Sequence, residues 1–144
     1  MLEARRIADV LGGSRVLKCR ITSVADLGRA VQNGLPKTSL ANAVRHVFAD
    51  RGEQRRMIYR VVPEATYKRR REHLSPAESE RTERLARVIA STEYVWDDTG
   101  DARRFLKTAH PALGNRCPLD AALTELGARQ VEELLSKILY GIAA

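Results

Sequence analysis

The sequence predicts an all-α protein that is built in two parts. Apolar residues recur at intervals of three and four along most of the chain, and residue types that begin or end helices stand at the ends of these runs. The clearest boundary is SPAE, Ser75 to Glu78, where serine is the N-cap, proline the first helical residue and glutamate the end of a capping box. No segment clearly predicts a strand, although Arg15–Ile21 fits either a short strand or a turn of helix.

The first fifty residues are predicted to form three short helices. The first ends at Gly12-Gly13, the second begins with Ser23 as its N-cap and ends at Asn33-Gly34, and the third breaks at residues 50–52. The apolar residues that share a face of each helix are, in order, Ile7, Val10 and Leu11; Val24, Leu27 and Val31; and Leu40, Ala43, Val44 and Val47. These faces are the expected core sides of the helices.

A helix, a tight turn and a strongly basic helix are predicted within residues 53–72. The buried stripe of the first helix is Met57, Ile58 and Val61. Pro63 disfavours helical geometry at Val62 and suits the first position of a new helix, which should run through EATYKRRRE. This arrangement is typical of a helix-turn-helix DNA reader, except that Tyr59-Arg60 stand at the turn, where a small residue and glycine are usual.

The rest of the chain is predicted to form one long helix and several shorter ones. The long helix begins after Ser75 and is expected to join the two halves of the molecule. A short helix should end before Pro111, Asp120 should lie in the first turn of a helix that follows Pro118, and Gly141 should end the last helix in a left-handed conformation. The apolar faces of the long, short and last helices are Leu85, Val88, Ile89, Thr92, Val95 and Trp96; Ala102, Phe105, Leu106 and Ala109; and Val131, Leu134, Leu135, Ile138 and Leu139.

Positive charge is concentrated in the first two thirds of the chain. The net charge is +7, and residues 1–96 carry 19 basic and 11 acidic side chains, whereas residues 97–144 carry 6 and 7. Residues 45–71 alone hold nine basic side chains against three acidic ones. No apolar run approaches the roughly 20 residues that span a bilayer, and the N-terminus is charged rather than signal-like, so a cytoplasmic protein without membrane contact is expected.

The basic helix and its turn are the candidate DNA-binding surface. Residues near its start would approach base edges, while arginines and lysines of both helices would neutralise phosphates. The residues expected to contact DNA are Arg55, Arg56, Glu64, Thr66, Tyr67, Lys68, Arg69, Arg70 and Arg71. An ordinary solvated face is the alternative, and DNA contact is favoured because the charge is concentrated and coincides with a turn between two short helices.

The chain shows no convincing catalytic or metal-binding motif. Its three histidines are dispersed, Gly12-Gly13 lacks the context of a phosphate loop, and Cys19 and Cys117 have no ligand spacing, so no cofactor and no metal are expected. A nucleophile made of Cys117 with His110 as its base is the remaining enzymatic hypothesis, but no residue is apparent that would orient the histidine. The sequence therefore predicts a binding protein rather than an enzyme.

The C-terminal part, residues 97–144, has too few short helices to bury its apolar faces alone. Its last helix is expected to pack on the long helix that begins after Ser75. The tail LYGIAA brings Leu139, Tyr140 and Ile142 close together, which leaves some apolar surface for a partner.

A long and regularly spaced pattern in this part resembles the Xre/MbcA/ParS antitoxin family. The run LSPAESERTERLARVIASTEYVWDD is followed by RRFLKTAHPALGNRCPLDAALTELGARQVEELLSKILYGIAA, and the similarity covers at least Leu74 to Ala144. The residues that match the family pattern are Phe105, Leu106, Pro111, Ala112, Leu113, Gly114, Pro118, Leu119, Asp120, Glu125, Gly127, Val131, Leu134, Leu135, Ile138, Gly141 and Ala144. Asn115 stands where the family usually has glycine, and His110 stands where it usually has asparagine.

This resemblance implies an N-terminal helix-turn-helix domain of the Xre/Cro-like type, residues 1–73, followed by a small helical toxin-binding domain, residues 74–144. Members of the family pair with RES-domain toxins that degrade NAD+, and the complex represses its own operon by binding operator DNA. By analogy, the loop HPALGNRCPLD holds the last helix so that its end, around Tyr140 to Ala144, blocks the entrance of the toxin's active site. A homodimer within the toxin-antitoxin complex is expected, since helix-turn-helix proteins commonly read paired half-sites.

The last helix and its flanking loop supply the residues expected to contact the toxin. These are Asn115, Arg116, Arg129, Glu132, Glu133, Ser136, Lys137, Tyr140, Gly141, Ile142, Ala143 and Ala144. The alternative is a stand-alone transcription regulator, whose C-terminal domain serves dimerisation or senses a small molecule. A gene for a RES-type protein beside this one would argue against that alternative.

Overall fold

The computed structural model describes residues 2–141, and every regular element within them is a helix. The elements are α1 (Ala4–Val10), α2 (Gly13–Leu17), α3 (Val24–Asn33), α4 (Lys37–Arg45), α5 (Arg51–Val61), α6 (Glu64–Arg69), α7 (Pro76–Trp96), α8 (Thr99–Lys107), the 3-10 helix η1 (Pro111–Leu113), α9 (Pro118–Ala121) and α10 (Glu125–Leu139). Extended pairing in this range is limited to two isolated bridges, Pro36 with His73 and His110 with Arg116. The predicted all-α class is confirmed.

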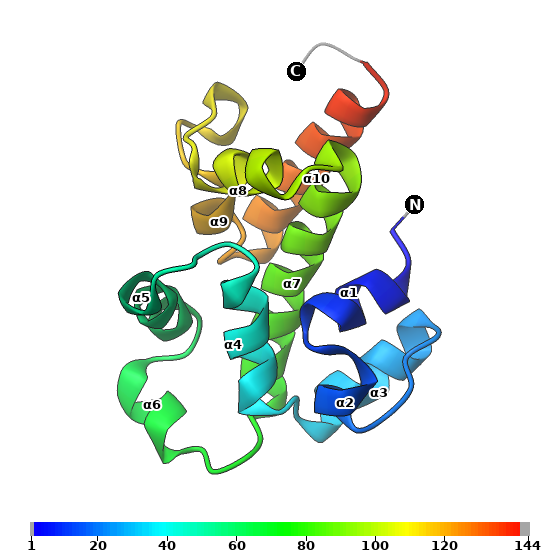
Figure 1. The fold of residues 1–144 in the computed structure, drawn as a ribbon, viewed down its shortest axis with the longest axis vertical. Helices are drawn as coiled ribbons and strands as arrows, with labels where there is room; N and C mark the ends of the chain where they lie inside the picture. Colours follow the sequence, from blue (N-terminus) through cyan, green and yellow to red (C-terminus); the bar gives the residue numbers. More distant parts are fainter. Residues whose placement is uncertain (1, 142–144) are drawn as a thin grey trace.

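The long helix α7 is the axis of the molecule. From the N-terminal part of the chain, α1, α3, α4 and α5 pack on α7. From the C-terminal part, α8, α9 and α10 pack on it. In Figure 1, α7 runs through the middle with the N-terminal helices in the lower part and the C-terminal ones above. Its side chains Leu85, Val88 and Ile89 are at most 1% exposed, and burying each contributes about 1.5–3 kcal/mol relative to leaving it in water. The expectation that this helix joins the two halves is therefore confirmed.

Helix starts follow the predicted capping chemistry. The Ser75 hydroxyl accepts a hydrogen bond from the backbone N–H of Glu78 at 3.2 Å, and the Glu78 carboxylate accepts one from the backbone N–H of Ser75 at 2.8 Å. These reciprocal bonds satisfy two donors that the first turn of α7 would otherwise leave free, and they form the predicted capping box. Ser23 caps α3 in the same way, by accepting from the N–H of Asp26.

Some local predictions need correction. Residues 15–17 belong to α2, and Lys18 ends that helix with φ of 60°, so the ambiguous stretch contains no strand. Val24 was expected on the buried face of α3 but is 78% exposed as the first residue of that helix, whereas Leu27 and Val31 further along the same face are at most 7% exposed. The basic helix α6 ends at Arg69 and not at Glu72, since the chain turns extended at Arg70.

The last helix follows its prediction closely, with one exception. Val131, Leu134 and Leu135 are at most 3% exposed, and Gly141 takes the left-handed conformation with φ of 70°. Leu139 belongs to the expected apolar stripe, but it is 42% exposed at the end of α10. Apolar surface is thus left at the tip of the molecule, where α10 ends at the top of Figure 1. No helix in the described range is both long and apolar enough to cross a membrane.

Candidate functional site

The turn between α5 and α6 is built by a valine and a proline. Val62 is extended, with φ of −132° and ψ of 120°, because the ring of Pro63 crowds a helical conformation at the preceding residue. Pro63 then precedes the first helical residue, Glu64. Tyr59 and Arg60 lie inside α5, so their size does not obstruct the turn, which corrects the expectation that they stand in it. The predicted order of helix, tight turn and basic helix is confirmed.

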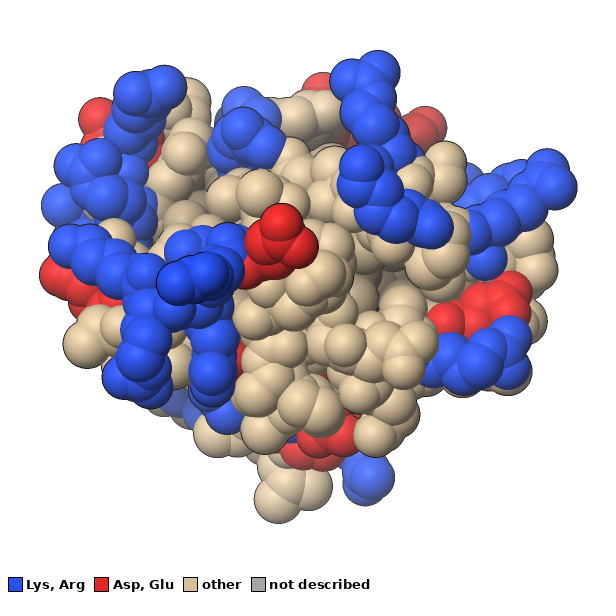
Figure 2. All heavy atoms as spheres, turned by 90° about the horizontal axis from the view of Figure 1, so that it is seen from below, with Lys and Arg blue, Asp and Glu red and all other residues tan. Residues whose placement is uncertain are grey.

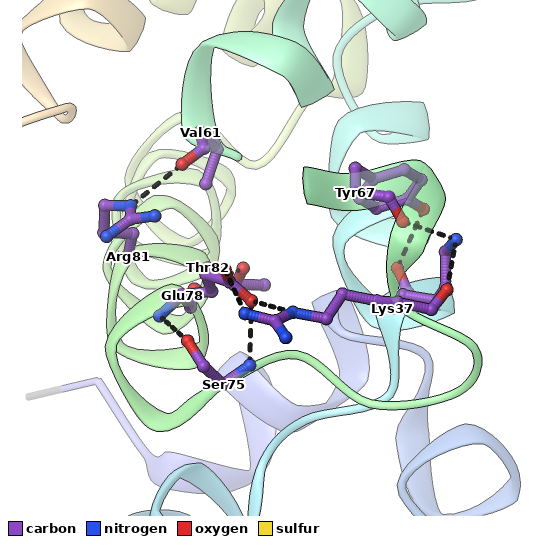
Figure 3. Close-up of polar contacts among 8 residues, drawn as sticks. Lys37, Val61, Tyr67, Ser75, Glu78, Arg81 and Thr82 are labelled. Atoms are coloured by element: carbon purple, nitrogen blue, oxygen red, sulfur yellow. Dashed lines mark hydrogen bonds and ion pairs between the residues drawn. The ribbon is translucent and has the colours of Figure 1, made fainter. Parts of the chain in front are cut away.

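Lys37 holds the C-terminal end of α6 in place. Its ammonium donates to the carbonyl oxygens of Tyr67, at 2.7 Å, and Arg70, at 3.0 Å, which are backbone acceptors at the negative end of the helix dipole. The same ammonium lies 4.3 Å from the centre of the Tyr67 ring, and the Tyr67 hydroxyl donates to the carbonyl of Lys37. Figure 3 shows Lys37 beside Tyr67 in this arrangement. One lysine on α4 thus fixes α6 through backbone and side chain.

Arg70 fastens the chain that leaves α6 to the start of α7. Its guanidinium donates to both carboxylate oxygens of Glu78, at 3.0 and 2.9 Å. The Glu78 side chain is 8% exposed and also belongs to the capping box with Ser75. These hydrogen bonds from Arg70 outweigh the effect of burial and lower the pKa of Glu78 from 4.5 to about 2. The pair is a fixed bidentate contact that a phosphate would have to replace.

Two further contacts tie α7 to the turn and to α4. The Arg81 guanidinium donates to the carbonyl of Val61 at 2.9 Å, directly before the turn (Figure 3). The buried Ser79 hydroxyl accepts from the backbone N–H of Leu35 at 2.7 Å, at the entry to α4. Arg60 reaches in the other direction, from α5 to the carboxylate of Asp120 in α9. The helix-turn-helix is therefore held from both ends of the molecule.

The residues expected to contact DNA fall into two groups. Exposed positions on α5, on α6 and just after α6 are Arg55, Arg56, Glu64, Lys68, Arg69 and Arg71. Thr66 is half-buried, Lys68 makes an exposed ion pair with Glu64 at 3.6 Å, and Tyr67 and Arg70 are engaged in the internal contacts described above. Figure 2 shows lysine and arginine side chains gathered at the left of the lower face, the side on which α5 and α6 lie in Figure 1. Among residues 2–141, no ion-pair partner is found for Arg55, Arg56, Arg69 and Arg71, so these cations are available for phosphate contacts, with Lys68 only loosely paired.

The loop HPALGNRCPLD is an ordered connection between α8 and α9. The backbone N–H of His110 donates to the carbonyl of Arg116, and Gly114 and Asn115 both take left-handed conformations, with φ of 65° and 61°. Leu113 points inward and is 1% exposed. The guanidinium of Arg116 donates to the Gln130 side chain at 2.8 Å, so the loop is joined directly to α10.

Helix α10 starts against α9 at a point where only glycine fits. The Thr124 hydroxyl caps the helix by accepting from the N–H of Gly127 at 3.0 Å. A Cβ atom at position 127 would lie 1.9 Å from the carbonyl oxygen of Ala121, so the two helices could not approach as they do. The loop, α9 and Thr124 together fix the direction in which α10 projects.

The residues expected to contact the toxin lie mostly on the exposed side of α10. Arg129, Glu133, Ser136, Lys137, Tyr140 and Gly141 are exposed on the helix and its end, and Asn115 and Arg116 are exposed on the loop. Glu132 is partly buried and lies 3.5 Å from Arg87 of α7, which makes it a less accessible contact. The positions Ile142, Ala143 and Ala144 lie outside the described residues. Leu126, 70% exposed, belongs to the same helix and was not expected as a contact, since its spacing does not match the buried stripe.

The enzymatic hypothesis gains no support from the geometry. Burial raises the pKa of the Cys117 thiol, which disfavours the thiolate that a nucleophile requires. The His110 ring nitrogen Nδ1 accepts a hydrogen bond from the backbone N–H of Ala112. Within residues 2–141, no group of three or more histidine, cysteine, aspartate or glutamate side chains is placed to hold a metal ion.

The fold and the exposed basic helix define a helix-turn-helix protein with a separate helical unit at its C-terminal end. A family model described as the antitoxin Xre-like helix-turn-helix domain matches residues 26–87. A second, described as the antitoxin Xre/MbcA/ParS C-terminal toxin-binding domain, matches residues 91–141. The chain belongs to the Xre/MbcA/ParS antitoxin family.

Two curated relatives agree with this assignment. The chain is 34% identical over 85 residues to a protein named antitoxin Xre from Yersinia enterocolitica. The aligned region covers 56% of this chain and 57% of the relative. The chain is 33% identical over 84 residues to an antitoxin Xre from Pseudomonas putida, with 56% and 53% covered. The chain thus spans about half the length of the curated relatives it matches.

Proposed function

We propose that this protein is the antitoxin of a toxin-antitoxin system. It binds a RES-domain toxin that degrades NAD+, occludes the entrance of the toxin's active site, and represses its own operon by binding operator DNA as a homodimer in the cytoplasm. It acts by stoichiometric binding and not by catalysis. In this division of labour residues 1–73 bind DNA and residues 74–144 bind the toxin.

The observation that carries the proposal is the match of residues 91–141 to a toxin-binding domain, on a unit whose last helix presents a largely polar exposed side and an apolar tip. Leu139 and Tyr140 are 42% and 69% exposed at that tip. An apolar anchor surrounded by charged side chains, here Glu133 and Lys137, is the composition that protein interfaces favour. Burying these apolar side chains in a pocket on a partner is more favourable than leaving them in water.

The DNA-binding half of the proposal rests on α5 and α6. Their exposed arginines would supply phosphate contacts, and Glu64 and Thr66 lie near the start of α6, the end from which a recognition helix reads base edges. Because Lys37 and Arg70 tie the end of α6 to α4 and α7, and Arg81 ties the end of α5 to α7, little ordering of these helices would be required on binding.

The test measures NAD+ consumption by the protein encoded beside this chain. The neighbour is assayed alone, with the full-length chain, and with a chain from which Tyr140–Ala144 has been removed. Loss of NAD+ that only the full-length chain stops supports the proposal in its full form. A neighbour that leaves NAD+ untouched would refute the RES assignment and favour a stand-alone transcription regulator, whose C-terminal unit serves dimerisation or senses a small molecule.

A further inference from the structure

A second cationic segment covers the end of α2 and the connection to α3, apart from the helix-turn-helix. Arg15, Lys18 and Arg20 are all exposed, and the chain contains no carboxylate between Asp9 and Asp26 to offset them. None of the three forms an ion pair with any residue in the part of the chain that the structure describes. Three exposed cations within six residues, with no carboxylate nearby in the sequence, create a local positive potential that attracts an anionic partner.

Other exposed arginines near the N-terminus are used differently. Arg5 lies 3.7 Å from the carboxylate of Glu3, and the Arg6 guanidinium lies 5.0 Å from the centre of the Tyr94 ring. Both therefore have an intramolecular partner. Arg15, Lys18 and Arg20 differ from them, since no ion-pair partner is found for these three among residues 2–141.

The backbone places this segment beside the chain that leaves α6. Lys18 turns left-handed, with φ of 60° and ψ of 21°, and lines a small hollow of about 240 Å³ together with Cys19, Pro36 and His73. Pro36 forms an isolated β-bridge with His73, and the neighbouring Lys37 N–H donates to the carbonyl of Glu72 at 2.8 Å. A path of direct neighbours thus leads from Arg71 through His73 to Lys18.

Lysine and arginine side chains gather at two ends of the lower face of the molecule. In Figure 2 the lower face has one group of lysine and arginine side chains at the left, where α5 and α6 lie, and another at the right, where α2 and α3 lie. The band between them is mostly uncharged. A helix in the major groove has a sugar-phosphate backbone on each side, because the two strands form the edges of this groove, which is about 12 Å wide. A protein face with cations at both ends is suited to contact both backbones.

We propose that Lys18 and Arg20, with Arg15 beside them, form a second phosphate-binding site that contacts the DNA backbone flanking the half-site read by α6. This inference rests on the proposed DNA binding by α5 and α6 and adds a contact outside the helix-turn-helix. The contact is to phosphate and therefore strengthens binding to any sequence, while α6 supplies the choice of sequence.

The first experiment measures how affinity for DNA depends on salt. A labelled duplex of the promoter region preceding the gene is titrated with the wild type and with Lys18→Gln/Arg20→Gln at several salt concentrations. The slope of log K against log[salt] should fall in magnitude by about 2, since each phosphate contact contributes about 0.9. The matched control Arg104→Gln/Lys107→Gln removes the same charge from exposed positions on α8 and should leave the slope unchanged.

The outcomes separate this inference from the proposed function. An unchanged slope in Lys18→Gln/Arg20→Gln, with a reduced slope in Arg69→Ala/Arg71→Ala, overturns the second site and leaves the helix-turn-helix reading intact. Equal losses in the test and control variants also overturn it, because the effect would then follow net charge alone. A wild type that does not bind the duplex refutes both.

Cys19 provides a second readout that needs no substitution. It is exposed between Lys18 and Arg20, whereas Cys117 is partly buried in the C-terminal unit and serves as the internal reference. The promoter duplex should slow alkylation of Cys19 by N-ethylmaleimide several-fold and leave alkylation of Cys117 unchanged, as read by peptide mass spectrometry. Equal rates at Cys19 with and without saturating duplex would overturn the inference.

Discussion

Arg70 and Glu78 form a bidentate ion pair that joins the residue after α6 to the third residue of α7. Arg70 lies in a run of four basic residues, Lys68 to Arg71, and the sequence gives no reason to treat it differently from its neighbours. In the structure it is the one of the four whose cation is engaged by a buried carboxylate, while Arg69 and Arg71 are exposed. Its role is to position α6, and this separates it from residues that would touch DNA.

The first prediction separates these roles by substitution. Arg69→Ala/Arg71→Ala should reduce the magnitude of the salt slope of DNA binding by about 2 and leave the melting temperature unchanged, since both side chains are exposed. Arg70→Ala should lower the melting temperature and weaken DNA binding with little change in the slope. Parallel behaviour of the two variants in both measurements would show that Arg70 contacts phosphate as its neighbours do.

The second prediction concerns stability at acid pH. The folded-state pKa of Glu78, about 2, lies below the ordinary value of 4.5, so the unfolded chain binds more protons in this range. The contribution of Glu78 is present above pH 4.5 and is lost as pH falls toward 2, on the order of 2–3 kcal/mol in the free energy of unfolding. The free energies of unfolding of the wild type and Glu78→Gln, measured with urea at several pH values, should converge as the pH is lowered. A constant gap between them would contradict the assignment.

The capping box shows what the sequence could and could not predict. Ser75, Pro76 and Glu78 lie within four residues, so local rules sufficed to predict the start of α7, and the structure confirms it. The partner of Glu78 was missed, although it lies only eight residues away, because an irregular turn separates them. Lys37 was missed as well, since its bonds to Tyr67 and Arg70 span about thirty residues and depend on how α4 and α6 pack.

The same limit applies to the exposed faces. Helical periodicity predicted the apolar stripe of α10. Val24 has the same spacing in α3 but is exposed. The periodicity of one helix does not tell how far a neighbouring helix extends along it, so this difference could not be predicted. Which residues of α10 would contact a toxin cannot be derived from this pattern either. The family resemblance supplied the partner, and the structure supplies the exposed side on which it would bind.

The third prediction tests the contact between α9 and α10. Gly127→Ala would place a Cβ 1.9 Å from the Ala121 carbonyl oxygen, so α10 must shift, and overpacking of this kind typically costs about 1–3 kcal/mol. Gly28→Ala is the matched control, since a Cβ there meets nothing within 4 Å and the residue lies inside α3. That control should stabilise the protein by about 0.5–1 kcal/mol. Urea unfolding measures both, and equal effects would show that the α9–α10 contact is not as close as described.

The fourth prediction addresses the tip of α10. Tyr140→Ala should reduce neutralisation of the neighbouring toxin at least tenfold, because a 69% exposed aromatic side chain at the end of the helix is the strongest candidate for an interface anchor. Removing it should leave the melting temperature and DNA binding unchanged, since it does not belong to the core. Tyr94→Ala, which removes the partly exposed tyrosine of α7 beside Arg6, is the aromatic control and should neutralise the toxin like the wild type. If Tyr140→Ala neutralises fully while truncation after Leu139 does not, the inhibitory contact lies in the last residues of the tail; if both neutralise fully, the toxin is held by the side of α10 or by its loop.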